Sequence, residues 1–363
     1  MTPPNTSGSA YLDPPVDGAV TGAEASGDDA RARRRLSMAL GVLMLLLALA
    51  GLATGARGFS PAALWADLQG EQAGLILGQI RAPRTLGAAL VGALLGLGGA
   101  LAQGLFRNPL ADPYLLGAAA GAGLAVVLVL AGTAVAGTAI SLATVAWFDR
   151  VGLVLAAFVG ALTGVALTLT LAQGAVHTLR LLLAGVVVAV LLGALSDLVT
   201  VAAPDALRGK QAFMLGSTSF LGWQAVALLA GGVAVLTALA LRCARALDAL
   251  TLGEDSAASL GVALPRMRLV LVALLAAATA LAVAHAGLVA FVGLVAPHLV
   301  RRHAPGPHAW LLAASAVMGA ALLMAADVVS RAVIPPQELP VGVVTAVLGG
   351  VYLFMLLRRR GLP

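Results

Sequence analysis

The stretch RARRRLSMALGVLMLLLALAGLA, residues 31–53, decides the fold class of this chain. Four arginines precede an uninterrupted apolar run from Leu36 to Ala53, close to the roughly 20 residues that a membrane-spanning helix needs. Arginines beside a span stay on the cytoplasmic side, so the run predicts a first transmembrane helix that enters from the cytoplasm. A signal peptide is the alternative, but the leader before the run is longer than signal peptides have.

Nine further apolar runs follow, and the composition agrees with them. The chain has 363 residues, of which 60% are hydrophobic and 10% are charged, whereas soluble proteins contain about 25% charged residues. The runs are continuous and do not alternate with polar residues, which argues against a membrane β-barrel. We therefore expect an all-α membrane protein with about ten transmembrane helices, at residues 36–54, 83–105, 114–132, 151–173, 181–203, 224–242, 267–286, 287–301, 309–329 and 340–357.

The basic residues predict how these spans are oriented. With the N-terminus inside, fifteen of the 22 lysines and arginines fall on the cytoplasmic side and seven on the outer side, as the positive-inside rule requires. Both termini are therefore expected in the cytoplasm. We expect residues 36–360 to form one polytopic transmembrane domain, and residues 1–35 to form a disordered acidic tail that ends in a basic cluster.

The sequence lacks the common motifs for nucleotide and metal binding. No G-x-x-x-x-G-K-[ST] pattern occurs, so a transporter of this kind would be driven by a gradient or by a separate ATPase. The single cysteine, Cys243, excludes an intrachain disulfide and a cysteine metal cluster. His298 and His303 have no acidic residue at ligand spacing, which argues against a metal site. An intramembrane enzyme would need a base–nucleophile set that the sequence lacks.

A short cytoplasmic helix is predicted at residues 251–261, between the sixth and seventh spans. Thr251 and Glu254 fit a T-x-x-E capping box, and Gly261 suits a left-handed C-cap. Such a helix either rests on lipid headgroups or inserts into a groove of a partner protein. The acidic residues at its start argue against docking onto anionic lipid.

Seven motifs in this order resemble the FecCD-type permease family, the membrane subunits of ABC importers for iron-siderophores, haem and cobalamin. The resemblance covers roughly residues 36–360 and rests on the segments RAPRTL (81–86), GLFRNPLADP (104–113) with LG (116–117), LLLAG (181–185), LGE (252–254) through LGV (260–262), FVGLVAPH (291–298), AD (326–327) and ELPVG (338–342).

The resemblance implies the type II fold of an ABC importer permease, in the cytoplasmic membrane of a bacterium. The permease would pair with a second copy or with a sister permease. Its other partners would be two cytoplasmic ATPase subunits and an extracytoplasmic substrate-binding protein. ATP and Mg²⁺ would be bound by the ATPase, so this chain itself would hold no cofactor and catalyse no reaction.

The resemblance also implies roles for residues at the outer side. Three arginines match positions that pair with glutamates of the binding protein in the cobalamin member of the family, namely Arg81, Arg84 and Arg331. Snorkelling to the interface is the alternative role for such arginines. Asp327 is expected to pair within the chain, with Arg331 one turn away.

On the cytoplasmic side, the resemblance identifies the helix at 251–261 as the coupling helix that contacts the ATPase. Its coupling residues would be Leu252, Gly253, Glu254, Ala257, Leu260 and Gly261. The residues of two gate segments would be Asn108, Pro109 and Leu110, and His177 and Thr178.

Asp197 lies in the fifth span, which the resemblance makes a wall of the translocation path. Ionisable residues inside a membrane usually face a cavity or a partner. Asp197 therefore either contacts the cargo or is a carboxylate near the outer interface.

The resemblance implies a permease subunit of an ATP-driven importer, and we expect a ferric siderophore as its cargo because siderophore systems are the commonest in this family. Haem and cobalamin are the alternative cargoes. A gradient-driven secondary transporter is the alternative from another class, but it would not need the coupling helix.

Overall fold

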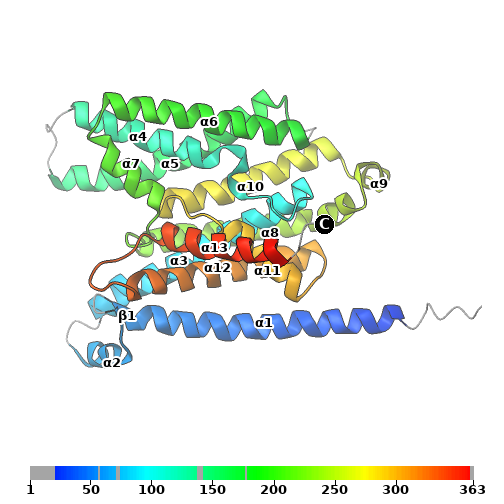
Figure 1. The fold of residues 1–363 in the computed structure, drawn as a ribbon, viewed down its shortest axis with the longest axis horizontal. Coiled ribbons are helices and arrows are strands. Elements are labelled where there is room, and N and C mark those ends of the chain that lie inside the picture. The colour runs from blue at the N-terminus through cyan, green and yellow to red at the C-terminus, as the bar shows by residue number, and fades with distance from the viewer. Residues whose placement is uncertain (1–20, 56–57, 71–73, 137–141, 176–177, 360–363) are drawn as a thin grey trace, which may run out of the picture.

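The computed structural model describes residues 21–55, 58–70, 74–136, 142–175 and 178–359 as a bundle of helices that run along one direction (Figure 1). The long elements are α1 (Thr21–Ala53), α3 (Ala82–Phe106), α4 (Ala118–Ala136), α5 (Leu142–Leu171), α6 (Thr178–Ala202), α8 (Trp223–Thr251), α10 (Leu264–Ala286), α11 (Val292–His303), α12 (His308–Ala332) and α13 (Val341–Arg359). The short elements are β1 (Thr54–Gly55), β2 (Gly58–Phe59), α2 (Pro61–Gln69), the π-helix η1 (Gly74–Arg81), the 3-10 helix η2 (Pro113–Leu116), α7 (Ala206–Leu215) and α9 (Glu254–Ser259).

Each of the ten long elements corresponds to one predicted span. Seven helices in the described residues are long and apolar enough to cross a membrane, and α4 and α13 contain shorter apolar helices. The tenth, α11, has 12 residues and is about 18 Å long at 1.5 Å per residue. The break predicted near Gly287 is confirmed, because α10 ends at Ala286 and Gly287 has a positive φ of 67°.

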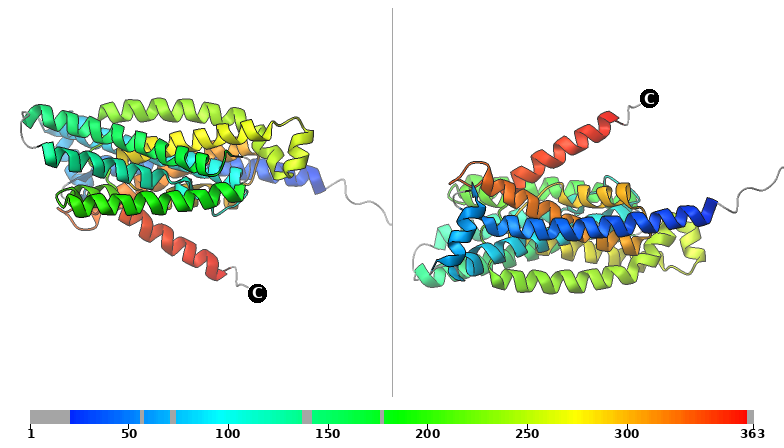
Figure 2. Two further views of the ribbon diagram at one scale, coloured as in Figure 1. Left: turned by 90° about the horizontal axis from the view of Figure 1, so that it is seen from above. Right: turned by 90° about the horizontal axis from the view of Figure 1, so that it is seen from below.

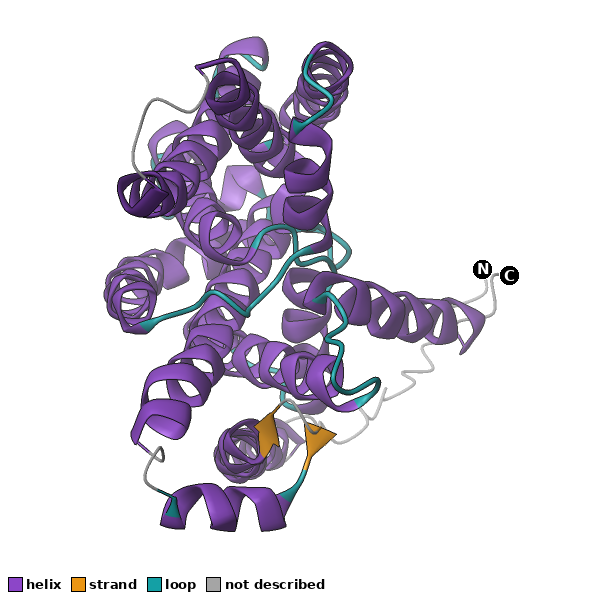
Figure 3. Cartoon of the chain, turned by 90° about the vertical axis from the view of Figure 1, so that its left-hand side faces the viewer, coloured by secondary structure: helices purple, strands orange, loops and turns teal. Residues whose placement is uncertain are grey.

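The first and last helices place the two described ends of the chain at the same end of the bundle. α1 begins and α13 ends at the same end as α9 (Figures 1 and 2), which agrees with the predicted placement of both termini on one side. We call this the cytoplasmic end, because the predicted inside arginines gather there. The opposite end, which holds β1, β2 and α2, is the outer end (Figure 3).

Helix α1 begins earlier in the chain than we predicted. α1 begins at Thr21, so residues 21–35 are helical, although we predicted them to belong to a disordered tail. Alanine, glutamate and arginine favour helix, and Asp28 and Arg31 form a pair at i,i+3 with 3.3 Å between their atoms. Arg33 donates a hydrogen bond to the carbonyl of Pro305. Residues 1–20 lie outside the described part of the chain.

Helix α3 is the centre of the bundle, because its glycines let other backbones approach it closely. A Cβ on Gly92 or Gly96 would overlap the carbonyl oxygen of Gly319 or Ser315 on α12, respectively, and a Cβ on Gly99 would overlap that of Gly293 on α11. Small residues spaced by four are the usual interface between membrane helices. The excess of glycine and alanine in the sequence therefore brings backbones into direct contact.

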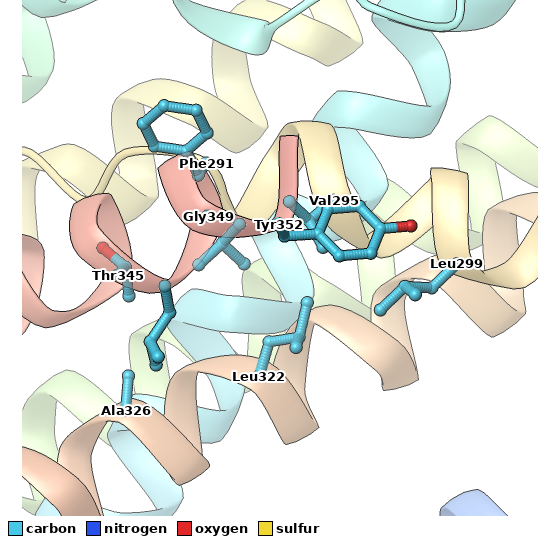
Figure 4. Close-up of a pocket in the computed structure, with 10 residues that line it drawn as sticks. Phe291, Val295, Leu299, Leu322, Ala326, Thr345, Gly349 and Tyr352 are labelled. Atoms are coloured by element: carbon cyan, nitrogen blue, oxygen red, sulfur yellow. The ribbon is translucent and has the colours of Figure 1, made fainter. Parts of the chain in front are cut away.

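The last helix is held less tightly than the others. α13 leans away from the bundle (Figure 2), and a mostly apolar cavity of about 170 Å³ lies between it, α11 and α12 (Figure 4). Gly349 and Phe291 meet there, and the ring of Tyr352 stands edge-on to His298 at 5.9 Å between centroids. This cavity is smaller than the roughly 300 Å³ of the smallest ligand pockets.

The α3–α12 contact gives a stability prediction. Gly96→Ala should destabilise the protein by about 1–3 kcal/mol, because its methyl group has no room beside Ser315. Gly231→Ala on α8 is the matched control, since nothing lies within 4 Å of its added Cβ; it should be neutral or stabilising by up to about 1 kcal/mol. Thermal unfolding of the two variants in detergent measures both effects. Equal midpoints for the two variants would contradict the close approach.

Candidate functional site

The outer end holds a buried network of charged side chains centred on Asp327 of α12. Arg84 of α3 donates from Nε to Asp327 Oδ1 at 3.0 Å, and from Nη1 to both carboxylate oxygens of Glu338 at 2.8 and 2.9 Å. Thr218 also donates to Asp327 Oδ1. Asp327 is 0% exposed, so its charge depends on these donors because water does not reach it.

Arg331 connects this network to the first helix. Its Nη2 pairs with Asp327 Oδ2 at 2.5 Å, and its Nη1 donates to the carbonyls of Gly51 and Thr54 at 3.0 and 2.8 Å. The predicted Asp327–Arg331 pair is confirmed. The network therefore joins α1, α3, α12, the loop before α8 and the loop before α13.

Two of the three arginines that we predicted to dock the binding protein are engaged within the chain. Arg84 and Arg331 are 9% and 3% exposed, and their guanidinium groups bind the chain's own carboxylates and carbonyls. They are counterions in the interior of the chain. The positive-inside count placed them correctly at the outer end, but it does not distinguish buried arginines from exposed ones. Arg81 differs, because it is half-buried and donates to the carbonyl of Leu52 at 2.8 Å. The docking role of all three arginines stays a prediction.

Glu338 is the charged member of the network for which we predicted no role from the sequence. It lies in the loop before α13 and also accepts a hydrogen bond from Ser219 at 3.0 Å. Burial alone would raise the pKa of the Glu338 carboxyl, but the hydrogen bonds from Arg84 and Ser219 and the charges of Arg84 and Arg331 outweigh it and hold the pKa below its ordinary value. Its contribution to stability is therefore present at neutral pH and is lost as the pH falls through this lowered pKa. The signal for it in the sequence is an acidic residue in the ELPVG motif, two residues before Pro340.

The predicted gate residues Asn108, Pro109 and Leu110 form an exposed turn at the cytoplasmic end of α3. The backbone amide of Asn108 donates to the carbonyl of Gln103, and the Asn108 side chain accepts from the amide of Leu110 at 2.9 Å. Arg107, directly before them, has the left-handed φ of 48°, which costs a residue other than glycine roughly 1–2 kcal/mol. The turn is therefore a defined and strained structure.

The other residues predicted for the translocation path belong to a different part of the sequence from this turn. Thr178 begins α6 and is half-buried, and His177 lies outside the described residues. Asp197 is on α6 with 78% of its side chain exposed, and it pairs with Lys210 of α7 at 2.5 Å. This ion pair gives the Asp197 carboxylate a partner within the chain, and its contact with cargo stays a prediction. A cavity of about 650 Å³ between α5, α8 and α10 is lined by none of the predicted site residues.

The predicted capping box of the cytoplasmic helix is wrong. Thr251 is the last residue of α8, and its hydroxyl donates to the carbonyl of Asp248 at 2.6 Å. The short helix is α9, which begins at Glu254 after Gly253. Gly253 has a φ of 107°, a conformation that only glycine adopts readily, so the chain breaks there and a new helix begins.

The C-terminal end of α9 is as predicted. Gly261 has a φ of 85°, and the amides of Gly261 and Val262 donate to the carbonyls of Ala258 and Ala257, which is a Schellman motif. Ala257 is fully buried, whereas Leu252 and Leu260 are 67% and 65% exposed. The helix thus sits on the bundle through Ala257 and presents two leucines outward.

Glu254 is engaged inside the chain. Its Oε1 atom lies 2.5 Å from Nη2 of Arg268 on α10 and 3.4 Å from Nη2 of Arg107 at the end of α3. Arg268 is buried, and the other two side chains are nearly half-exposed. Among the described residues, no group of three or more His, Cys, Asp or Glu stands close enough to hold a metal ion.

Comparison with known proteins identifies the architecture that these sites belong to. Residues 43–359 match the FecCD transport family.

The chain belongs to the FecCD transport family.

Several relatives agree with this membership. The hemin transport system permease HmuU of Yersinia pestis is 37% identical over 322 residues, which cover 88% of this chain and 94% of that protein. The vitamin B12 import system permease BtuC of Klebsiella pneumoniae is 38% identical over 336 residues, covering 91% and 96%. A solved metal-chelate-type ABC transporter in an inward-facing conformation superposes with a TM-score of 0.76 at 25% identity, covering 90% of this chain and 99% of that one.

As a FecCD member, the chain is a multi-pass permease of an ABC importer. The family consists of transport components, and ATP hydrolysis is carried out by separate chains. The gradient-driven alternative is therefore excluded. Membership further implies a dimeric permease with ATPase and binding-protein partners in the inner membrane of a bacterium.

The buried network gives the second prediction. Asp327→Asn should destabilise the protein by about 3–5 kcal/mol, because it leaves two buried arginines without their shared counterion. Asp197→Asn is the control, since that carboxylate is exposed and exposed pairs contribute about 0–1 kcal/mol. Thermal unfolding in detergent measures both variants. A midpoint for Asp327→Asn equal to that of the control would refute the interpretation of the network.

Proposed function

We propose that this FecCD permease translocates a ferric siderophore that an extracytoplasmic binding protein delivers, and that α9 receives the ATPase that drives it. The observation that carries the proposal is α9 itself, a short helix at the cytoplasmic end whose flanking leucines are exposed while its middle is buried. Exposed leucines beside a docked helix are typical of a surface that inserts into a partner's groove.

The cargo proposal is a bulky metal chelate, with a ferric siderophore first because siderophore systems are the commonest in the family. Haem and cobalamin are the competing cargoes, since relatives are permeases named for hemin and vitamin B12. No metal site on this chain is required, because the metal would arrive already chelated.

The test is transport into proteoliposomes that contain the permease, its ATPase and its binding protein. A labelled ferric hydroxamate siderophore, haem and cyanocobalamin are offered separately, with ATP and with a non-hydrolysable analogue. ATP-dependent uptake of the siderophore alone supports the proposal, whereas uptake of haem or cobalamin alone replaces the cargo. Uptake of any cargo without the ATPase would overturn the importer mechanism.

The exposed leucines give the third prediction. Leu252→Ala and Leu260→Ala should each weaken ATPase binding about tenfold or more, because a buried leucine side chain contributes about 1.5–3 kcal/mol and 1.4 kcal/mol is a factor of ten. Leu207→Ala is the control, since Leu207 is exposed at the outer end, on α7. Binding of the purified ATPase to the permease in nanodiscs measures the effect. Unchanged affinity in both variants would mean that α9 does not receive the ATPase.

Arg81 gives the fourth prediction. Arg81→Glu should weaken docking of the binding protein, because a carboxylate partner would meet a like charge. Arg208→Glu on α7 is the matched charge reversal at an exposed position of the same end, and it should leave docking near the wild-type level. Binding-protein affinity at low and at high salt measures both variants. Equal effects of the two reversals would remove the specific role of Arg81.

A further inference from the structure

One carboxylate joins the predicted coupling helix to two other helices at the cytoplasmic end. Glu254 is the first residue of α9, and its Oε1 atom forms ion pairs with Arg268 of α10 and with Arg107, the residue that follows α3. Leu252 and Leu260 face outward beside it. Glu254 is thus engaged by its own chain, although the family resemblance assigned it to the ATPase contact.

The arginine that Glu254 reaches on α3 directly precedes the exposed turn of Asn108, Pro109 and Leu110. Arg107 has a left-handed backbone, and the amide of the next residue, Asn108, closes the end of α3 on Gln103. Strained backbone of this kind persists only where the surroundings hold it. A force on the Arg107 side chain therefore acts on the residue that sets the conformation of the turn.

Helix α9 has the features of a unit that can be displaced as a whole. Gly253, with its φ of 107°, separates it from α8, and Gly261, with its φ of 85°, ends it. Movements of packed elements are absorbed by a few residues at element ends. A displacement of α9 between these two glycines would carry Glu254 with it.

We propose that Glu254 is a positioning residue that transmits the displacement of α9 to the turn at residues 107–110 through its ion pair with Arg107, with Arg268 as the fixed partner on α10. The proposal rests on the proposed function, in which α9 receives the ATPase. It assigns the ATPase contact to the exposed leucines and assigns the connection to the gate to the carboxylate.

A merely structural role for Glu254 makes a different prediction. If the carboxylate only fastened α9 to the bundle, its removal would lower stability and ATPase binding together. As a connection, its removal should leave ATPase binding intact and reduce the response of the turn to nucleotide. Arg107 separates the two roles, because it is nearly half-exposed and its loss leaves Arg268 paired with Glu254.

The experiment follows the turn directly with a cysteine at Leu110, which is 45% exposed. The background is Cys243→Ala, which removes the single native cysteine. Maleimide labelling of Leu110→Cys is timed in the permease–ATPase complex in nanodiscs, with and without ATP and Mg²⁺. Glu254→Gln, Arg107→Gln and the double variant are compared with Asp255→Asn, which removes the same charge from an exposed neighbour that shows no ion pair among the described residues.

The expected result is a labelling rate that changes with nucleotide in the parent and in Asp255→Asn. Glu254→Gln and Arg107→Gln should each reduce that change up to about fivefold, which corresponds to the roughly 1 kcal/mol that an exposed ion pair contributes, and the double variant should be no worse than either single one. ATPase affinity should stay at the parent level in all of them.

Three outcomes would overturn the proposal. They are a turn that does not respond to nucleotide in the parent, a full response in Arg107→Gln, and effects of the two single variants that multiply in the double one. Should Glu254→Gln fail to fold because Arg268 loses this carboxylate, Arg107→Gln alone decides. Failure of the ATPase to bind the parent permease is a separate result, which would refute the proposed function itself.

Discussion

The close approach of other backbones to α3 is the constraint on which the rest of the structure depends. Lipid is as apolar as the side chains that face it, so helices associate in a membrane through van der Waals contact and hydrogen bonds. The glycines at 92, 96 and 99 let the backbones of α12 and α11 touch α3. With its axis fixed in this way, α3 presents Arg84 at the outer end and Arg107 at the cytoplasmic end.

The few charges of the chain are concentrated at those two ends, and each end uses them differently. At the outer end Asp327 is wholly buried and its donors surround it, so the network is fixed and costly to break. At the cytoplasmic end Glu254 and Arg107 are nearly half-exposed at 3.4 Å, a pair that water can replace at low cost. Because of this difference in burial, the ion-pair network at the outer end resists rearrangement, whereas the Glu254–Arg107 pair at the cytoplasmic end can rearrange.

The spans were predictable from the sequence because their signal is local. Continuous apolar runs mark the ten helices, and the break at Gly287 follows from the length limit of a single span. The capping box failed because Thr251 is also in reach of the carbonyl of Asp248 at the end of α8, a competition that the spacing alone does not resolve. The extension of α1 back to Thr21 was not predicted, because amino-acid composition does not report tertiary contacts such as the hydrogen bond from Arg33 to the carbonyl of Pro305.

The roles of the arginines were harder to predict, since burial is a property of the assembled fold. Arg84 and Arg331 are separated in sequence by almost the whole transmembrane domain, and both meet Asp327 only after α3 and α12 have packed. A resemblance carries a residue's position from one protein to another, but the partner of a charged side chain depends on what surrounds it in three dimensions. Arg81 has a different environment from Arg84. It lies about one turn before Arg84, at the end of η1, and is half-buried. In the proposed docking, the binding protein would contact Arg81 at the end of η1, outside the buried network that Arg84 of α3 forms with Asp327.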